Sequence, residues 1–451
     1  MIGHVSGHDE PRRAERVRAY WTYAVIVVVW AWVCVPNVIQ TLLSPKYRSG
    51  VGVETAPYSR IAAAADYLLF FGVVGVCLLV IIGYLNDVDT SAFGRLVVII
   101  APWVYIVVRD LYVPRSLSEE GVAYILIVIA IWFLRPGLGR LQCLGYLMGA
   151  TAAVSIAIAL VLPAQAIFRT AAGVVIEDDK QILPGGILVG IFTQGNNLGQ
   201  FLALGLPTVF LVRQRWHRLV LAALSLIAIT WSASRGAMIA VGAGLVAYLL
   251  VRACAPWLRR IAAPVLVAGA FGIVCLLPLV TTAPEAFTNR GLVWVTSLQA
   301  WQHEPWTGLG SNWYSEVGRT SARVAASVFH AHNQLVQLLV TGGIIFVLVV
   351  LPLLVVATVR ATGLAVRGEF FAVSWLVTLA GSCLLEKSFA FVDNGNFLAA
   401  TVLPLAILVL GSDGALRRSG HLATGAGETV IGSRGIRPDD RRFSSRAPGS
   451  T

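Results

Sequence analysis

Apolar runs of about twenty residues recur along this chain, separated by short polar or arginine-bearing stretches. A helix needs about 20 apolar residues to cross roughly 30 Å of hydrocarbon. Because backbone amides find no water inside a bilayer, each run is predicted to be a helix. We predict about twelve spans, near 20–42, 61–85, 93–113, 120–135, 141–163, 184–212, 218–233, 236–254, 260–280, 334–358, 370–386 and 396–411.

The composition agrees with an all-α, polytopic membrane protein. Hydrophobic residues make up 57% of the 451 residues and charged residues 13%, and the mean hydropathy is +0.77. An ordinary soluble domain is about 25% charged. The predicted organisation is a cytoplasmic N-terminal tail at 1–19, a transmembrane domain at 20–411, and a Gly-, Ser- and Arg-rich disordered cytoplasmic tail at 412–451.

The arginines predict an orientation. They precede the first span, follow the last, and occupy alternate links, while the other links are poorer in basic residues. The positive-inside rule then places both termini in the cytoplasm. These arginines account for most of the net charge of +11, and they are spread over short links, so no nucleic-acid partner is predicted. They are Arg12, Arg13, Arg16, Arg18, Arg135, Arg140, Arg213, Arg215, Arg218, Arg252, Arg259, Arg260, Arg360, Arg367, Arg417 and Arg418.

Two polar patches lie within or between spans, where such residues are costly and often functional. Residues 193–200 read Thr-Gln-Gly-Asn-Asn-Leu-Gly-Gln and include Asn197. They predict either a helix break that lines a polar cavity or a short outer loop between a re-entrant segment and the true span. Arg235 sits in a tight outer link, on the side that the positive-inside rule disfavours. We interpret Arg235 as an anion contact, the alternative being an arginine that reaches lipid phosphate.

A third patch is the outer loop at 281–333. It contains Arg290, a short predicted helix around Trp294, and the turn-permitting glycines Gly308 and Gly310. The aromatic residues of the loop fit either an interfacial belt or a platform on which sugars stack.

The loop ends in His330 and His332, directly before Asn333. Histidines at i and i+2 are not a helical metal pair, and no carboxylate motif accompanies them, so no metal site is predicted. A fourth patch, around Glu386 and Asp393, is expected to be a solvated loop.

The order of these motifs resembles the bacterial O-antigen ligase and Wzy-type polymerase superfamily, over roughly residues 184–350. The upstream segment Gly195-Asn196-Asn197-Leu198 is similar to the family's Asn-Pro-Asn region, although the proline is replaced. The other elements are Ser234-Arg235-Gly236, Arg290-Gly291-Leu292-Val293-Trp294, Pro305 to Gly310, His332-Asn333 and Gly342-Gly343.

The resemblance implies a GT-C-like, inverting glycosyltransferase of the bacterial cytoplasmic membrane that needs no metal or other cofactor. Its implied partners are membrane lipids, a glycan donor linked to polyprenyl diphosphate, and a glycolipid or glycan acceptor outside the cytoplasm. His332 is the implied general base, and the guanidinium groups of Arg235 and Arg290 suit the diphosphate. The wider predicted substrate-binding set adds His330, Asn333, Asn197, Trp294, Gly308 and Gly310.

Four alternatives stay open at this point, and one of them is a protein O-oligosaccharyltransferase that would share the same donor site. A Wzy-like polymerase would use the same donor site. A flippase for lipid-linked glycans would need charge at mid-membrane depth, whereas most predicted spans lack ionisable residues at their centres. An enzyme with a polyprenyl-monophosphate donor would use acidic residues in the first outer loop, which here has only Glu54.

Overall fold

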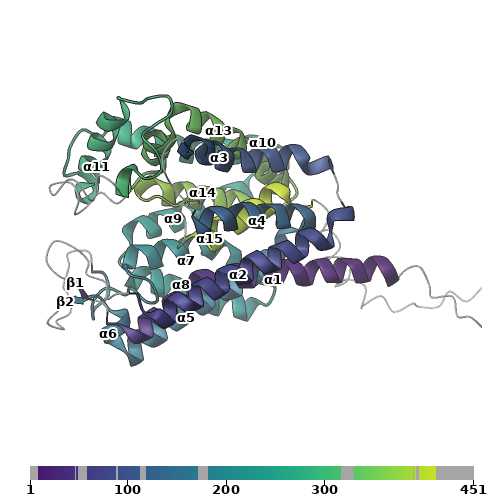
Figure 1. Ribbon diagram of the computed structural model, residues 1–451, viewed down its shortest axis with the longest axis horizontal. Helices are drawn as coiled ribbons and strands as arrows, with labels where there is room; N and C mark the ends of the chain where they lie inside the picture. Colours follow the sequence, from purple (N-terminus) through teal and green to yellow (C-terminus); the bar gives the residue numbers. More distant parts are fainter. Residues whose placement is uncertain are drawn as a thin grey trace, which may run out of the picture.

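The structure is a bundle of helices that run roughly along its long axis (Figure 1). The computed structural model describes residues 9–45, 47–48, 58–87, 90–111, 118–170, 181–315, 330–389, 391–392 and 396–412. Its α-helices are α1 (Asp9–Leu43), α2 (Arg60–Gly83), α3 (Phe93–Asp110), α4 (Glu119–Leu134), α5 (Gln142–Val161), α6 (Pro163–Ala166), α7 (Gly195–Val209), α8 (Arg215–Trp231), α9 (Arg235–Ala253), α10 (Pro256–Val280), α11 (Ala286–Trp301), α13 (Gln334–Val366), α14 (Phe371–Leu385) and α15 (Leu398–Leu410). Three short 3-10 helices are η1 (Leu85–Asp87), η2 (Thr90–Ala92) and η3 (Leu138–Leu141), and two short strands, β1 (Tyr47–Arg48) and β2 (Arg169–Thr170), pair in parallel.

Every predicted apolar segment overlaps one of these α-helices, and the structure is that of a polytopic membrane protein. α14 and α15 are apolar but shorter than a typical span, and α4, α7 and α8 have 16, 15 and 17 residues. The count of about twelve spans therefore stays a prediction. Seven helical segments among the described residues are long and apolar enough to cross a membrane: Ala14–Leu43, Arg60–Gly83, Thr90–Asp110, Leu138–Val161, Arg235–Ala253, Pro256–Val280 and Gln334–Val366.

The predicted span at 184–212 is wrong in its first part, because α7 begins only at Gly195. Residues 181–194 form an irregular segment in which three glycines have positive φ, a conformation that ends regular helix. The segment still satisfies backbone groups by pairing with neighbouring elements, as when Leu188 N–H donates to the carbonyl of Trp231 at 3.1 Å. This outcome is closer to the short-loop interpretation than to a broken helix.

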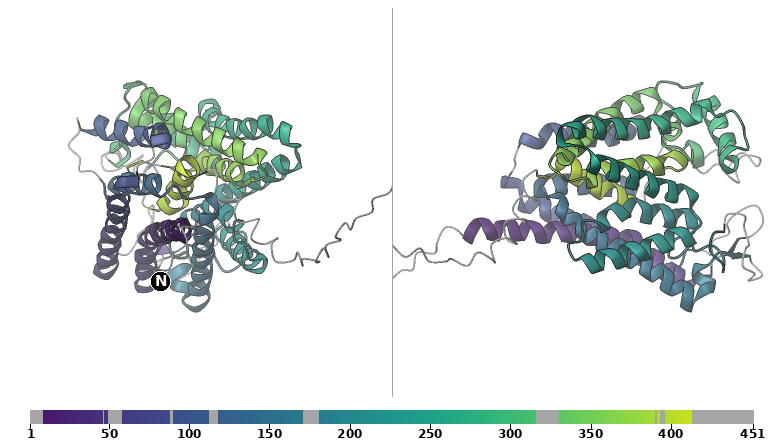
Figure 2. Two further views of the ribbon diagram at one scale, coloured as in Figure 1. Left: turned by 90° about the vertical axis from the view of Figure 1, so that its right-hand side faces the viewer. Right: turned by 180° about the vertical axis from the view of Figure 1, so that it is seen from behind.

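Helix α14 runs through the middle of the bundle and packs against α7, α9, α10 and α13. Nearly all its side chains are buried, including Trp375. α15 (yellow in Figure 2) is buried along its whole length as well. A helix that is apolar all round is expected in such a central place. Because α14 is buried on all sides, Glu386, the residue directly after it, is held at a fixed position.

The bundle has two chemically different ends. The arginine end is defined by Arg18, Arg135, Arg140 and Arg360, whose guanidinium groups tie neighbouring helices together. The loop end carries α11 and the described parts of 281–333, and it lies opposite the projecting start of α1 (Figure 1). The positive-inside rule predicts that the arginine end faces the cytoplasm.

Helix α1 begins at Asp9, within the predicted N-terminal tail at 1–19, whose cytoplasmic location stays a prediction. The predicted tail at 412–451 lies outside the described residues, apart from residue 412.

Helix α13 is interrupted at Gly343, where φ is 70° and ψ is −168°. The segment after α11 fills the break: Leu309 N–H donates to the carbonyl of Val340 at 2.6 Å, and Ile344 N–H donates to that of Pro305 at 2.9 Å. The Pro-x-x-Gly-x-Gly and Gly-Gly motifs are thus two halves of one structural element. It attaches the loop to α13 through backbone hydrogen bonds.

We predict that Gly343→Ala destabilises the protein, whereas Gly363→Ala in the same helix does not. A Cβ at Gly343 would collide with the backbone of Trp306 and would sit at positive φ, while a Cβ at Gly363 meets nothing within 4 Å. This positive-φ conformation with extended ψ is essentially limited to glycine and alone costs another residue about 1–3 kcal/mol. Thermal melting in detergent measures the difference. Equal melting temperatures for the two variants would contradict the proposed role of the break.

Candidate active site

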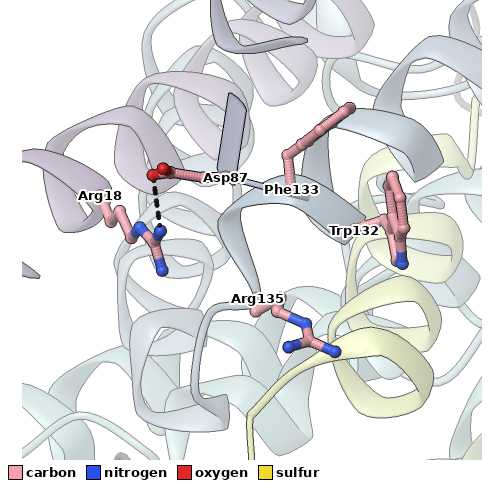
Figure 3. A pocket seen from close by; sticks show the side chains of 5 residues that line it. All are labelled: Arg18, Asp87, Trp132, Phe133 and Arg135. Atoms are coloured by element: carbon pink, nitrogen blue, oxygen red, sulfur yellow. Dashed lines mark hydrogen bonds and ion pairs between the residues drawn. The ribbon is translucent and has the colours of Figure 1, made fainter. Parts of the chain in front are cut away.

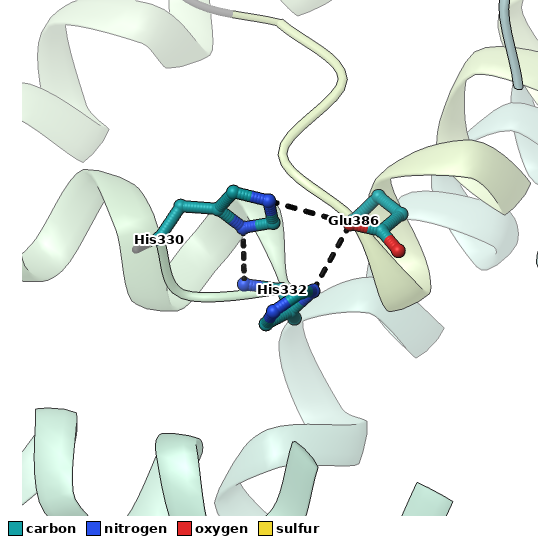
Figure 4. A group of neighbouring side chains, drawn as sticks. All are labelled: His330, His332 and Glu386. Carbon is teal, nitrogen blue, oxygen red and sulfur yellow. Dashed lines mark hydrogen bonds and ion pairs between the residues drawn. The ribbon is translucent and has the colours of Figure 1, made fainter. Parts of the chain in front are cut away.

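At the loop end, His330 and His332 lie beside the carboxylate of Glu386, which is distant from them in sequence (Figure 4). Arg290 of α11 joins this cluster. His332 Nδ1 lies 3.0 Å from Glu386 Oε2, and His330 Nε2 lies 3.5 Å from the same oxygen. Arg290 Nη2 forms a close ion pair with the other carboxylate oxygen, Oε1. The side chains are only 13–18% exposed, so these charges interact with little screening by water.

The charges around Glu386 decide its protonation state. Burial by itself would raise the pKa of this carboxyl, but the hydrogen bond and charge of His332, together with Arg290 and His330, lower it to about 2. Glu386 is therefore an anion at neutral pH. Burial and the neighbouring charge of His332 hold the pKa of His330 well below its usual value, so His330 is neutral at the same pH.

The hydrogen-bond partners limit where the imidazole protons lie. Because the Glu386 carboxylate can only accept, His332 donates to it from Nδ1. His330 Nδ1 accepts the backbone N–H of His332 at 3.0 Å, so its proton lies on Nε2. His332 is therefore oriented by Glu386 through its Nδ1, whereas His330 holds the turn in place.

The backbone has unusual conformations at His332 and directly before Arg290. His332 has φ of 50°, and Phe287, Thr288 and Asn289, directly before Arg290, all have positive φ. Such conformations cost about 1–3 kcal/mol each and tend to occur at functional sites.

Because Gly291 has no Cβ, the backbone beside Arg290 can approach its neighbours closely. It packs against the carbonyl of Ala283, and a Cβ there would collide with that oxygen. Leu292 N–H donates to the carbonyl of Pro284 at 3.0 Å. Arg290 is thus aimed by a tightly packed turn.

A buried polar network holds the segment after α14. Gln200 Nε2 donates to the hydroxyls of Ser382 (2.7 Å) and Ser388 (2.6 Å). Gln334 brackets Phe389, accepting its N–H at 3.0 Å and donating to its carbonyl at 2.6 Å. Satisfied buried networks of this kind specify one arrangement of the chain. The polar patch at 193–200 thus contributes Gln200 to the support of Glu386.

Asn333 has a structural role in this arrangement. Its side chain is fully buried, and its Oδ1 caps α13 by accepting the N–H groups of Leu335 (2.9 Å) and Val336 (3.2 Å). Its Nδ2 donates to the carbonyls of Val274 and Leu384, both at 3.1 Å. Asn333 therefore joins α10, α13 and α14 beside the histidines and is held away from solvent.

Arg235 and Asn197 lie at the edge of the cluster. Arg235 is the exposed first residue of α9, and its neighbour Gly236 lies against Leu385, which directly precedes Glu386. Asn197 is half-buried in the first turn of α7. Both residues are on the loop end with Arg290 and His332.

The remaining residues of the predicted substrate-binding set pack within the protein. Trp294 is fully buried in a small core with Tyr314, which does not leave its ring on a sugar-binding surface. Gly308 has φ of 66° and packs on the backbone of the α13 break, and Gly310 has φ of 102°. Arg109 Nη2, at the end of α3, donates to the carbonyl of Gly308 at 2.6 Å.

The expectation that Glu386 lies in a solvated loop is wrong, because its side chain is 13% exposed and ion-paired. The statement that no carboxylate accompanies the histidines holds only for the local sequence, since Glu386 lies 54 residues from His332. Asp393 and Glu54 lie outside the described residues.

The same three groups have the chemistry of a metal site. One ligand atom each from His330, His332 and Glu386 lie within 4.8 Å of one another. Two imidazoles and a carboxylate suit a divalent transition metal. The Arg290 guanidinium on the same carboxylate works against it, because a cation already neutralises that charge.

Helices of this length and hydropathy define a multi-pass membrane protein, with a histidine–carboxylate–arginine cluster at one end. Comparison with protein families matches residues 220–351 to the O-antigen ligase family, which confirms the resemblance predicted from the motifs. No curated protein matches the chain. The matched segment contains Arg235, Arg290 and His332 but ends before Glu386. The family implies a glycan-transferring enzyme with lipid-linked glycan substrates.

We predict that stability falls in acid through Glu386. Its pKa lies below the ordinary value of 4.5, so its contribution is fully present above pH 4.5 and is lost as the pH falls toward about 2. The melting temperature of the wild type in detergent should therefore fall over this interval. Glu386→Gln should melt lower at pH 7 and show a smaller acid-induced fall. An equally steep fall in that variant would assign the acid sensitivity to other groups.

Proposed function

We propose that this protein is an inverting glycosyltransferase that moves a glycan from a polyprenyl-diphosphate carrier to a hydroxyl of a lipid or glycan acceptor. The observation that carries the proposal is the oriented dyad of His332 and Glu386 beside the guanidinium of Arg290. The family match supports the class of reaction. We place the site on the outer face of the cytoplasmic membrane, because the loop end lies opposite the arginine end.

In the proposed reaction the acceptor hydroxyl attacks the anomeric carbon while His332 Nε2 takes its proton. The Glu386 carboxylate, 3.0 Å from Nδ1, fixes the tautomer and stabilises the imidazolium that forms. A new C–O bond forms as the bond from the anomeric carbon to the diphosphate oxygen breaks. The electron pair leaves with the diphosphate, and a single displacement of this kind inverts the anomeric centre.

Arg290 and Arg235 are proposed to bind the diphosphate. One guanidinium nitrogen of Arg290 holds Glu386, and the planar group has further N–H donors that match phosphate oxygens. Arg235 lies at the rim, at the level where a lipid-linked headgroup would arrive. Fixed cations at that point stabilise the negative charge that grows on the leaving group.

The ligase and the polymerase would share this donor site and differ in the acceptor. A glycolipid core as acceptor would define a ligase, and a second glycan chain would define a polymerase. A flippase would form no glycosidic bond. Transfer by purified protein between a lipid-linked donor and an added acceptor, without a gradient, therefore separates these functions.

We predict that His332→Ala lowers transfer by about 10²–10⁴-fold, the range typical for loss of a general base. His303→Ala is the matched control, because His303 is an exposed histidine of the same loop and should retain activity. Folding of both variants is checked by expression and by elution in detergent. Each assay is repeated with a metal chelator, which should leave the rate unchanged.

Two results would count against this assignment. Unchanged product formation by His332→Ala would reject the base. Loss of transfer on chelation, restored by zinc, would instead make His330, His332 and Glu386 ligands of a catalytic metal.

We predict that Arg290→Lys lowers kcat/KM at least about tenfold although the charge is kept, because an ammonium cannot hold Glu386 and a phosphate oxygen in one plane. Arg235→Lys should also lower it. Arg140→Lys at the arginine end, where the guanidinium donates to Tyr23 Oη at 3.0 Å, is the control and should transfer normally. Full activity in Arg290→Lys would show that a point charge is sufficient.

A further inference from the structure

The end of α3 binds the segment 305–311, which fills the break in α13. Arg109 donates from Nη2 to the carbonyl of Gly308 at 2.6 Å and from Nε to the carbonyl of the preceding residue at 3.1 Å. Asp110 accepts the hydroxyl of Ser311 and lies 3.4 Å from Arg109 Nη1. Two adjacent side chains of α3 therefore hold this segment at two places.

These contacts are enclosed by the protein. The side chains of Arg109 and Asp110 are 15% and 14% exposed. Gly310 lies so close to the guanidinium that a Cβ at this position would collide with Nη1 of Arg109. By contrast, the ion pair of Arg18 and Asp87, which lines a pocket of about 330 Å³ at the arginine end, is 39% and 56% exposed (Figure 3). Water screens such an exposed pair, so the contacts at the end of α3 constrain the chain more strongly.

The 305–311 segment is connected to both helices that carry the proposed reacting groups. On one side, Trp301 at the end of α11 donates from its indole Nε1 to the carbonyl of Pro305 at 3.0 Å, and α11 also carries Arg290. On the other side, the backbone of the segment pairs with the break in α13, and His332 lies just before that helix. A shift of the segment would therefore change the position of Arg290 relative to His332.

Helix α3 is also tied directly to the break in α13. Tyr105, one turn before Arg109, donates from Oη to the carbonyl of Gly342 at 2.6 Å, and its ring stacks on that of Phe346 with centroids 5.4 Å apart. α3 thus binds both partners of the contact between the segment and α13. The family match covers residues 220–351, so α3 lies outside the matched part of the chain.

We propose that Arg109 and Asp110 are positioning residues for glycan transfer, an inference that rests on the proposed function. They fix the 305–311 segment, and the segment in turn fixes Arg290 and His332 relative to each other. A misplacement of about 1 Å can lower a rate about 10²-fold. A looser segment therefore lowers transfer even when the protein stays folded.

The first test is a double-mutant cycle on the purified full-length protein, read as kcat/KM for transfer per folded molecule. Arg109→Gln removes the guanidinium and should lower kcat/KM about tenfold. In the Arg290→Lys background the same substitution should lower it less than about twofold, because the geometry that Arg109 maintains is already lost. Arg95→Gln is the matched control: at the other end of α3, Arg95 donates to the carbonyl of Val409 at 3.0 Å, and its loss should leave kcat/KM unchanged.

Arg109→Lys is the milder variant. Its ammonium keeps the charge but lacks the planar fork that reaches two carbonyls, so kcat/KM should fall about threefold. This variant decides the question if Arg109→Gln does not fold.

The second test is hydrogen–deuterium exchange, which does not depend on activity. In Arg109→Gln, peptides that cover 305–311 and 330–337 should exchange at least about fivefold faster, whereas in Arg95→Gln they should exchange at the wild-type rate. This measurement decides the inference even if the wild type transfers no glycan, a result that would count against the proposed function alone.

Three results would overturn the inference. The first is unchanged exchange in Arg109→Gln. The second is an equal loss of kcat/KM in Arg109→Gln and Arg95→Gln, which would mean a general destabilisation of α3. The third is an equal loss from Arg109→Gln with and without Arg290→Lys, which would mean that Arg109 does not act through the position of Arg290.

Discussion

The ion pair between Glu386 and Arg290 is the contact on which the loop end depends. A carboxylate that is 13% exposed needs a compensating charge, since an unpaired buried anion would cost several kcal/mol. Arg290 supplies that charge from 96 residues away in the sequence, and this brings the loop after α10 against the end of α14. The second carboxylate oxygen then orients His332. The Glu386 side chain therefore joins distant parts of the chain at this site and orients His332.

The surrounding scaffold keeps this carboxylate from moving. α14 is buried among four helices, Gln200 and Gln334 hold the segment after it, and Asn333 caps α13 while binding carbonyls of α10 and α14. The break at Gly343 adds a further constraint by pairing α13 with the loop. Each support is a hydrogen bond inside the protein, as expected where few water molecules can satisfy backbone and amide groups. Several polar residues thus support the position of Glu386 and His332 through hydrogen bonds within the protein.

The sequence predicts the helices well because their cause is local: twenty apolar residues in lipid have little choice of structure. It also brings out Arg290 and His332, whose motifs lie in a recognisable order. It misses Glu386, because a lone Glu-Lys pair in a short link has the composition of a solvated loop, and only the tertiary structure brings it to His332. The burial of Trp294 is not evident from the sequence for the same reason, since it depends on partners such as Tyr314. The start of α7 is missed because glycine conformations end the helix within an apolar run.

Arginine side chains have different electrostatic partners at the two ends of the bundle. At the arginine end, guanidinium groups bind carbonyls and hydroxyls of neighbouring helices, as Arg360 does with Gly411 at 2.6 Å, and so stay where the cytoplasmic charge bias favours them. At the loop end, Arg290 is on the side that the predicted orientation disfavours, and it is held there by a buried carboxylate. Glu386 offsets the cost of placing a cation on the side that the positive-inside rule disfavours. An arginine held in this way is a candidate for a functional role, unlike an arginine that only sets the membrane orientation. The position of the carboxylate, more than the arginine itself, therefore distinguishes the proposed catalytic end from the anchoring end.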